Sequence, residues 1–179
     1  MTNRNDNFRT YWNDYISNQR PYDIFSTLTF AKQLTDAYAI KSYNFLLHQL
    51  SKTLFGQRYK RKMLFNEGFV FAERQVNGNL HFHSIIKFHQ KLSSYQKDCY
   101  EGIYRSCAAK LTAPNRNLEP VVITDPQGID IQPYDNNLTL IDYLTKAMKY
   151  ENKNIPDSIS PISINGIDLL DLHLKHLHT

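Results

Sequence analysis

Residues 69–88 read FVFAERQVNGNLHFHSIIKF, and this stretch decides the fold. A first run of residues precedes the dipeptide Asn77-Gly78, with Val70, Ala72 and Arg74 alternating with Phe71, Glu73 and Gln75, and a second run of strand-forming residues follows it from 80 to 88. Both residues of an Asn-Gly pair tolerate positive φ, so the pair is a strong local signal for a hairpin. The stretch therefore predicts two antiparallel strands joined by a tight turn.

Three potential metal ligands lie on the predicted hairpin. Side chains two residues apart in a strand point to the same face, so His81 and His83 project together. Glu73, on the neighbouring strand, can project beside them. Two imidazoles and one carboxylate on hydrogen-bonded strands predict a three-ligand site for a divalent cation, with coordination positions left open. The alternative interpretation is that the histidines are half-buried polar residues that bind no ligand.

Local patterns predict the remaining elements of the fold. In chain order they are a short N-terminal helix before Pro21, a strand over 24–30, helices over 35–54 and 91–111, strands over 121–124 and 128–132 around an Asp125-Pro126 turn, and a helix over 138–151. This order predicts an α+β fold, with a central antiparallel sheet of about five strands and helices packed on its faces. We expect residues 1–154 to form this domain and residues 155–179 to form a turn-rich C-terminal appendage.

Composition and charge restrict the possible surroundings and partners. Hydrophobic residues make up 41% of the 179-residue chain, which is enough for a normal core, and the net charge of +4 weakly favours an anionic partner. The densest basic run contains Arg58, Lys60, Arg61 and Lys62. It predicts either a solvated loop or a loop beside the metal site that contacts nucleic-acid phosphates. No apolar run approaches the ~18 residues of a membrane span, and the first residues are polar, so we expect a cytoplasmic protein with no membrane partner.

The predicted helix over 138–151 carries Tyr143 and Lys146 three residues apart, on one helical face. A tyrosine in a helix is usually a core or surface aromatic. A free phenol has a pKa of ~10, but a nearby cation and an ammonium group favour the phenolate, which is a nucleophile. The sequence therefore leaves two roles open for Tyr143, packing or attack on a phosphate beside the predicted cation.

Three motifs together resemble one enzyme family. His81-Phe82-His83 is similar to the His-hydrophobic-His motif of the HUH endonucleases, and the segment from Tyr143 to Lys146 is similar to their Tyr-x-x-Lys helix. Residues 26–30, STLTF, resemble the first-strand motif of the replication-initiator (Rep) branch. The order, histidines first and tyrosine later, matches that branch, and the resemblance spans about residues 22–150. It implies a palm of the HUH type, related to ferredoxin-like and RNA-recognition folds.

The resemblance also implies a function. It implies that His81, His83 and Glu73 bind Mg²⁺ or Mn²⁺ and that Tyr143 attacks a phosphodiester of single-stranded DNA, with Lys146 as its electrostatic partner. The product is a 5′-phosphotyrosine and a free 3′-hydroxyl, which starts rolling-circle replication of a plasmid or phage. Tyr150 would pack or stack on DNA. The chain has no GxxxxGK[ST] loop, so a host helicase and polymerase would complete the process.

Two other functions fit parts of the sequence. A single-tyrosine HUH transposase has the same order of motifs, although lysine three residues after the tyrosine favours the replication branch. A non-enzymatic module that binds single-stranded nucleic acid has a similar sheet. The chain lacks the RNP-type signature of such modules, which counts against that alternative.

Overall fold

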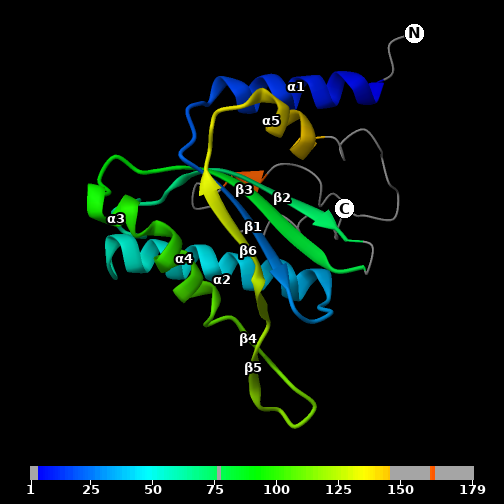
Figure 1. The fold of residues 1–179 in the computed structure, drawn as a ribbon, viewed down its shortest axis with the longest axis vertical. Coiled ribbons are helices and arrows are strands. Elements are labelled where there is room, and N and C mark those ends of the chain that lie inside the picture. Colours follow the sequence, from blue (N-terminus) through cyan, green and yellow to red (C-terminus); the bar gives the residue numbers. More distant parts are fainter. Residues whose placement is uncertain (1–3, 76–77, 146–161, 164–179) are drawn as a thin grey trace.

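The computed structural model describes residues 4–75, 78–145 and 162–163, and these form an α+β fold around one antiparallel sheet (Figure 1). The strands lie in the order β6-β1-β3-β2-β7. Their bounds are Thr124–Pro133 for β6, Ile24–Phe30 for β1, Leu80–Lys87 for β3, Glu67–Arg74 for β2 and Ile162–Ser163 for β7. Four strands are long and β7 has only two residues. The predicted α+β class with an antiparallel sheet is confirmed.

The predicted hairpin forms the centre of the sheet. β2 and β3 pair in the register that places Glu73 opposite His81 and Phe71 opposite His83. The turn is closed by a hydrogen bond of 2.8 Å from the backbone N–H of Gln75 to the carbonyl oxygen of Asn79. Gly78 has φ 87°, a conformation that glycine adopts without steric cost. Asn77, the other half of the predicted turn, lies outside the described residues.

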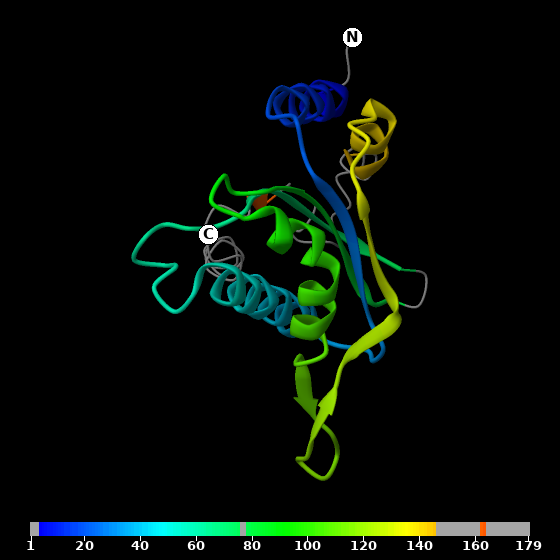
Figure 2. The ribbon, with the colours of Figure 1, turned by 60° about the vertical axis from the view of Figure 1, so that its left-hand side comes forward.

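Two helices cover each face of the sheet (Figures 1 and 2). The helices α2, Asp36–Phe55, and α4, Tyr100–Ala108, pack against one face. On the other face, α1, Arg4–Asn18, and α5, Leu138–Thr145, pack against each other and over part of the sheet. The alternation of side chains along β1 separates the two cores, because its even-numbered residues face α2 and its Phe25 faces α1 and α5.

The helices begin where side chains satisfy the first backbone N–H groups. The Oγ1 of Thr35 accepts a hydrogen bond of 3.3 Å from the N–H of Tyr38, and α2 ends before Gly56, which has φ 80°. The Oδ1 of Asn137 accepts a hydrogen bond of 2.9 Å from the N–H of Thr139 at the start of α5. Both predicted starts are confirmed within a residue. The part of the third helix predicted beyond Thr145 lies outside the described residues.

The predicted helix over 91–111 is wrong in its length. Two shorter helices, α3, Ser94–Asp98, and α4 meet at Cys99, whose φ of −89° and ψ of 3° interrupt the helical geometry. Ser93 caps α3: its Oγ accepts from the N–H of Gln96, and its own N–H donates to the Oε1 of Gln96. α4 ends at Ala108, three residues before the predicted end, and Thr112–Pro114 then forms β4, a strand that was not predicted. The apolar stripe of α4 begins at Tyr100, and the positions one turn before it, Gln96 and Lys97, are polar, so the apolar periodicity covers only the second of the two helices.

The predicted strands over 121–124 and 128–132 are also corrected. Pro120–Val122 forms β5, which pairs with β4 in a small ribbon of its own. β6 then includes the dipeptide Asp125-Pro126, which was predicted as a turn, although residues 125–128 bulge out of the pairing with β1. β6 is an edge strand, where a missing backbone N–H breaks no ladder bond, so proline is tolerated there. The pairing of β6 with β1 shifts register at this point, between Leu28 and Phe30 of β1.

Most of the expected C-terminal appendage, residues 155–179, lies outside the described residues. Its Ile162–Ser163 segment, however, forms β7 and pairs antiparallel with β2, with Ser163 opposite Phe69 and Ile162 opposite Val70. These two residues therefore extend the sheet at the edge that β2 would otherwise leave open.

Candidate metal centre and neighbouring tyrosine

The hairpin brings the three predicted ligands together. The Oε2 atom of Glu73 lies 3.2 Å from the Nε2 atom of His81 and 3.2 Å from the Nε2 atom of His83. The two imidazole rings are 4.5 Å apart between centroids. This convergence follows from the strand register, because Glu73 stands opposite His81 and the period of two puts His83 on the same face.

The donor atoms fit a divalent cation. One donor atom from each residue lies within 4.8 Å of the others. A cation bound at about 2.1 Å places adjacent donors at right angles about 3 Å apart, which matches the spacing between Glu73 and either histidine. The side chains of Glu73, His81 and His83 are 30%, 14% and 10% exposed, so the carboxylate is partly open to solvent and the two imidazoles are mostly covered. The arrangement is a candidate metal centre with coordination positions left for a substrate or water.

His83 is held from two sides by strand β1. The Oγ1 atom of Thr27 lies 2.9 Å from the Nδ1 atom of His83. The ring of Phe25 stacks on the imidazole, with centroids 5.7 Å apart and planes inclined by 16°. These contacts leave the Nε2 atom of His83 directed at Glu73. The first-strand motif quoted above includes Thr27, but the sequence predicted no contact of Thr27 or Phe25 with His83.

Tyr143 lies beside the triad. Its ring is 6.2 Å from that of His83 between centroids, with the planes at 78°, an edge-to-face contact. Helix α5 explains the position, because Ile141 and Leu144 are buried in the core shared with α1. Tyr143 falls on the remaining side of the helix and is 44% exposed. The phenol is therefore both accessible and adjacent to a candidate metal ligand.

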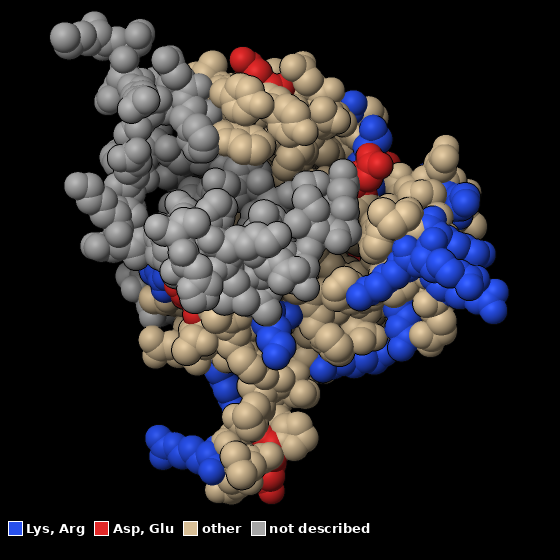
Figure 3. Space-filling view, turned by 180° about the vertical axis from the view of Figure 1, so that it is seen from behind, with Lys and Arg blue, Asp and Glu red and all other residues tan. Residues whose placement is uncertain are grey.

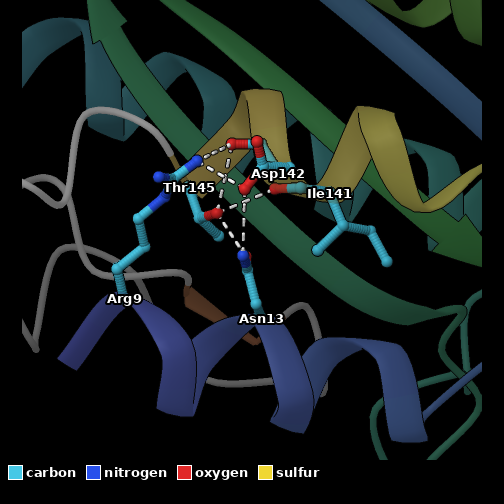
Figure 4. Close-up of polar contacts among 5 residues, drawn as sticks. All are labelled: Arg9, Asn13, Ile141, Asp142 and Thr145. Carbon is cyan, nitrogen blue, oxygen red and sulfur yellow. Dashed lines mark hydrogen bonds and ion pairs between the residues drawn. The ribbon is translucent and has the colours of Figure 1, made fainter. Parts of the chain in front are cut away.

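A polar cluster fixes α5 against α1 on both sides of Tyr143 (Figure 4). The guanidinium of Arg9 donates to the backbone carbonyl oxygen of Asp142 at 2.9 Å and forms an ion pair with its carboxylate. Asn13 donates to the same carboxylate at 3.3 Å. The hydroxyl of Thr145 bonds the side chain of Asn13 and lies 2.9 Å from the carbonyl oxygen of Ile141. The residues before and after the phenol are thus tied to one neighbouring helix.

The basic loop is not beside the metal site. Residues 58–62 precede β2, whereas Glu73 stands near the end of that strand, six residues or about 20 Å beyond Glu67. Arg58, Lys60, Arg61 and Lys62 are exposed, and Tyr59 is buried against His48, whose Nδ1 lies 3.0 Å from its hydroxyl. The loop lies at the left in Figure 1. Figure 3 shows the molecule from behind, and Lys and Arg side chains gather at its right, which is the same side of the molecule. The predicted proximity of the loop to the cation is therefore wrong.

Two other predicted site residues, Lys146 and Tyr150, lie outside the described residues, so their predicted roles stay predictions. The residues that sequence reasoning missed are Arg9 and Asn13, together with the roles of Thr27 and Phe25. Thr27 stands in the quoted first-strand motif, so that motif was a usable signal. Arg9 and Asp142 are 133 positions apart, and no local pattern connects them.

Comparisons with known proteins identified no relative of this chain. No protein family model matches the chain, and no curated protein or solved structure matches it. Within the described ranges, no helix combines the length and apolar character that crossing a bilayer requires. The function is therefore inferred from the geometry of the site and from the motifs.

Proposed function

We propose that this protein is a metal-dependent HUH-type endonuclease that nicks and rejoins single-stranded DNA and starts rolling-circle replication. The observation that carries the proposal is the edge-to-face contact between Tyr143 and His83. An exposed phenol beside two imidazoles and a carboxylate combines a nucleophile with a cation site. The order of the motifs and the antiparallel sheet support the same class.

The donor set supports Mn²⁺ more than Mg²⁺ as the natural cation. Mg²⁺ prefers oxygen ligands and retains its water, whereas two of the three donors here are imidazole nitrogens. A cation bound by Glu73, His81 and His83 would polarise the scissile phosphate and stabilise the charge that develops on it. The site is rigid because the carboxylate and the two rings project from paired strands.

In the proposed reaction, the phenol of Tyr143 releases its proton to solvent, and its oxygen attacks the phosphorus and forms a new P–O bond. The bond between the phosphorus and the 3′-oxygen of the preceding nucleotide breaks. That oxygen takes up a proton and leaves as a 3′-hydroxyl, while the 5′-phosphate remains on the tyrosine. No phosphodiester is lost, so a 3′-hydroxyl can later attack the phosphotyrosine and rejoin the strand. The buried sides of α5 hold the phenol in place during both steps.

The test is formation of a covalent protein–DNA adduct. The protein is mixed with a library of single-stranded DNA and Mn²⁺, and the products are separated on a denaturing gel. We expect a slower-migrating adduct that is absent in EDTA and sensitive to DNase. A protein that holds single strands equally well in EDTA and forms no adduct would instead be a binding module.

A further inference from the structure

The hydroxyl of Thr27 occupies a special position next to the candidate metal centre. Thr27 stands directly opposite His83 in the pairing of β1 with β3, and its Oγ1 lies 2.9 Å from the ring Nδ1 atom. The other ring nitrogen, Nε2, is the one that faces Glu73. The imidazole of His83 is therefore held at one nitrogen by Thr27 and offered to a cation at the other.

The chemistry of a hydroxyl suits both states of such a ring. When Nε2 binds a cation, the ring proton must sit on Nδ1, which then donates to the oxygen of Thr27. When no cation is bound, Nε2–H can donate to Glu73, and Nδ1 then accepts from the hydroxyl of Thr27. A hydroxyl rotates to donate or accept, so it bonds the ring in either tautomer. A methyl group in its place would do neither.

Thr29 provides an internal comparison on the same strand. Thr29 stands opposite His81, as Thr27 stands opposite His83, and all four side chains point to one face of the sheet. The buried Nδ1 atom of His81, however, has no hydrogen-bond partner in the part of the chain that the structure describes. Of the two histidines, only His83 receives this support from β1.

We infer that Thr27 is a positioning residue that fixes the orientation of His83 for metal binding, with Nδ1 held by the hydroxyl and Nε2 directed at Glu73. The inference rests on the proposed metal centre and adds to it a residue outside the three ligands. Hydrogen-bond partners of metal-bound histidines are worth on the order of 10- to 100-fold in metal affinity. The stacked ring of Phe25 restricts the plane of the imidazole, and Thr27 then decides which nitrogen faces Glu73.

The experiment measures Mn²⁺ affinity in the intact protein by electron paramagnetic resonance, which detects free Mn²⁺ directly. The variants are Thr27→Val, Thr27→Ser and the matched control Thr29→Val. Valine keeps the shape of threonine and removes only the hydroxyl, and serine keeps the hydroxyl. We expect Thr27→Val to weaken Mn²⁺ binding at least about tenfold, Thr27→Ser to restore most of the affinity, and Thr29→Val to resemble the parent.

A second measurement reports on the ring itself. Nitrogen-15 NMR of the histidine side chains in metal-free protein should show a changed Nδ1 signal of His83 in Thr27→Val, with the signals of His81 unmoved. Equal Mn²⁺ affinity in the parent and Thr27→Val would overturn the role of Thr27 and leave the proposed function intact. A parent protein that binds no Mn²⁺ would overturn the metal centre and this inference together.

Discussion

Arg9 of α1 bonds both the backbone carbonyl and the side-chain carboxylate of Asp142, the residue that directly precedes Tyr143. The side chain of Arg9 is only 15% exposed, whereas that of Asp142 is 62% exposed. An ion pair with one exposed partner contributes little to global stability, typically about 0–1 kcal/mol. Its effect is local, because it fixes the helix that carries the phenol.

Substitution of this pair is therefore expected to slow catalysis more than it lowers stability. Arg9→Ala should reduce the rate of adduct formation several-fold and change the free energy of unfolding by about 1 kcal/mol or less. Mn²⁺ affinity should stay at the parent value, since the triad lies on other elements. A cycle with Asp142→Ala measures the coupling, and fully additive effects on the rate would contradict a positioning role for the pair.

Removal of one metal ligand is expected to abolish stabilisation by the cation. A ligand that binds only the folded state stabilises it by about 2.7 kcal/mol at 100 times its Kd. The parent should therefore melt at a higher temperature with Mn²⁺, and Glu73→Gln should not. Glu67→Gln is the matched control, because Glu67 is an exposed carboxylate on the same strand and the same face. An equal Mn²⁺-induced shift in Glu73→Gln and the parent would exclude Glu73 as a ligand.

The basic loop lies far from the triad, so its charges are expected to affect DNA affinity and not chemistry. Substituting glutamine for Lys60, Arg61 and Lys62 should weaken binding of single-stranded DNA. It should also flatten the salt dependence of binding, by up to about 0.7 in slope for each phosphate that the loop no longer neutralises. Adduct formation at saturating DNA should be unchanged.

The control for the loop is a triple variant that replaces the exposed Lys32, Lys41 and Lys52 with glutamine, which removes the same charge elsewhere. We expect this control to bind single-stranded DNA more tightly than the loop variant. If both triple variants lose affinity equally, the loop makes no specific contact with single-stranded DNA.

Alkaline pH is expected to destabilise the fold through its buried tyrosines. Burial raises the pKa of Tyr43 to about 12 from the ordinary value of 10.0. The unfolded chain therefore loses this proton first, so the stability contribution is complete below pH 10 and disappears as the pH rises to about 12. Two pKa units correspond to about 3 kcal/mol. Urea unfolding between about pH 9 and pH 12 measures the loss, and Tyr43→Phe should fall less steeply than the parent; identical slopes would contradict this assignment.

Local signals predicted the elements that depend on local chemistry. The first strand, the helix from Thr35 to Gly56 and the central hairpin all carry their own start, stop or turn residues. The errors arise where tertiary position overrides such signals. The dipeptide Asp125-Pro126 remains in a strand because β6 is at the edge of the sheet, and the helix predicted over 91–111 breaks at Cys99, directly before the apolar stripe that begins at Tyr100.

The candidate site also contains residues that the sequence predicted and residues that it did not. The triad was predictable because strand period and hairpin register place Glu73, His81 and His83 on one face. The contact of Tyr143 with His83 joins residues that are distant in the sequence, and only the resemblance to a family suggested it. The bond between Arg9 and Asp142 had no sequence signal, because helices α1 and α5 meet only in the folded chain.

The most direct test of the central claim compares the parent with Tyr143→Phe in the adduct assay with Mn²⁺. Phenylalanine keeps the ring beside His83 and removes only the phenolic oxygen. The account predicts that Tyr143→Phe binds Mn²⁺ and single-stranded DNA as the parent does and forms no covalent adduct. An undiminished adduct in Tyr143→Phe, or an adduct that is lost in Tyr150→Phe instead, would contradict Tyr143 as the nucleophile.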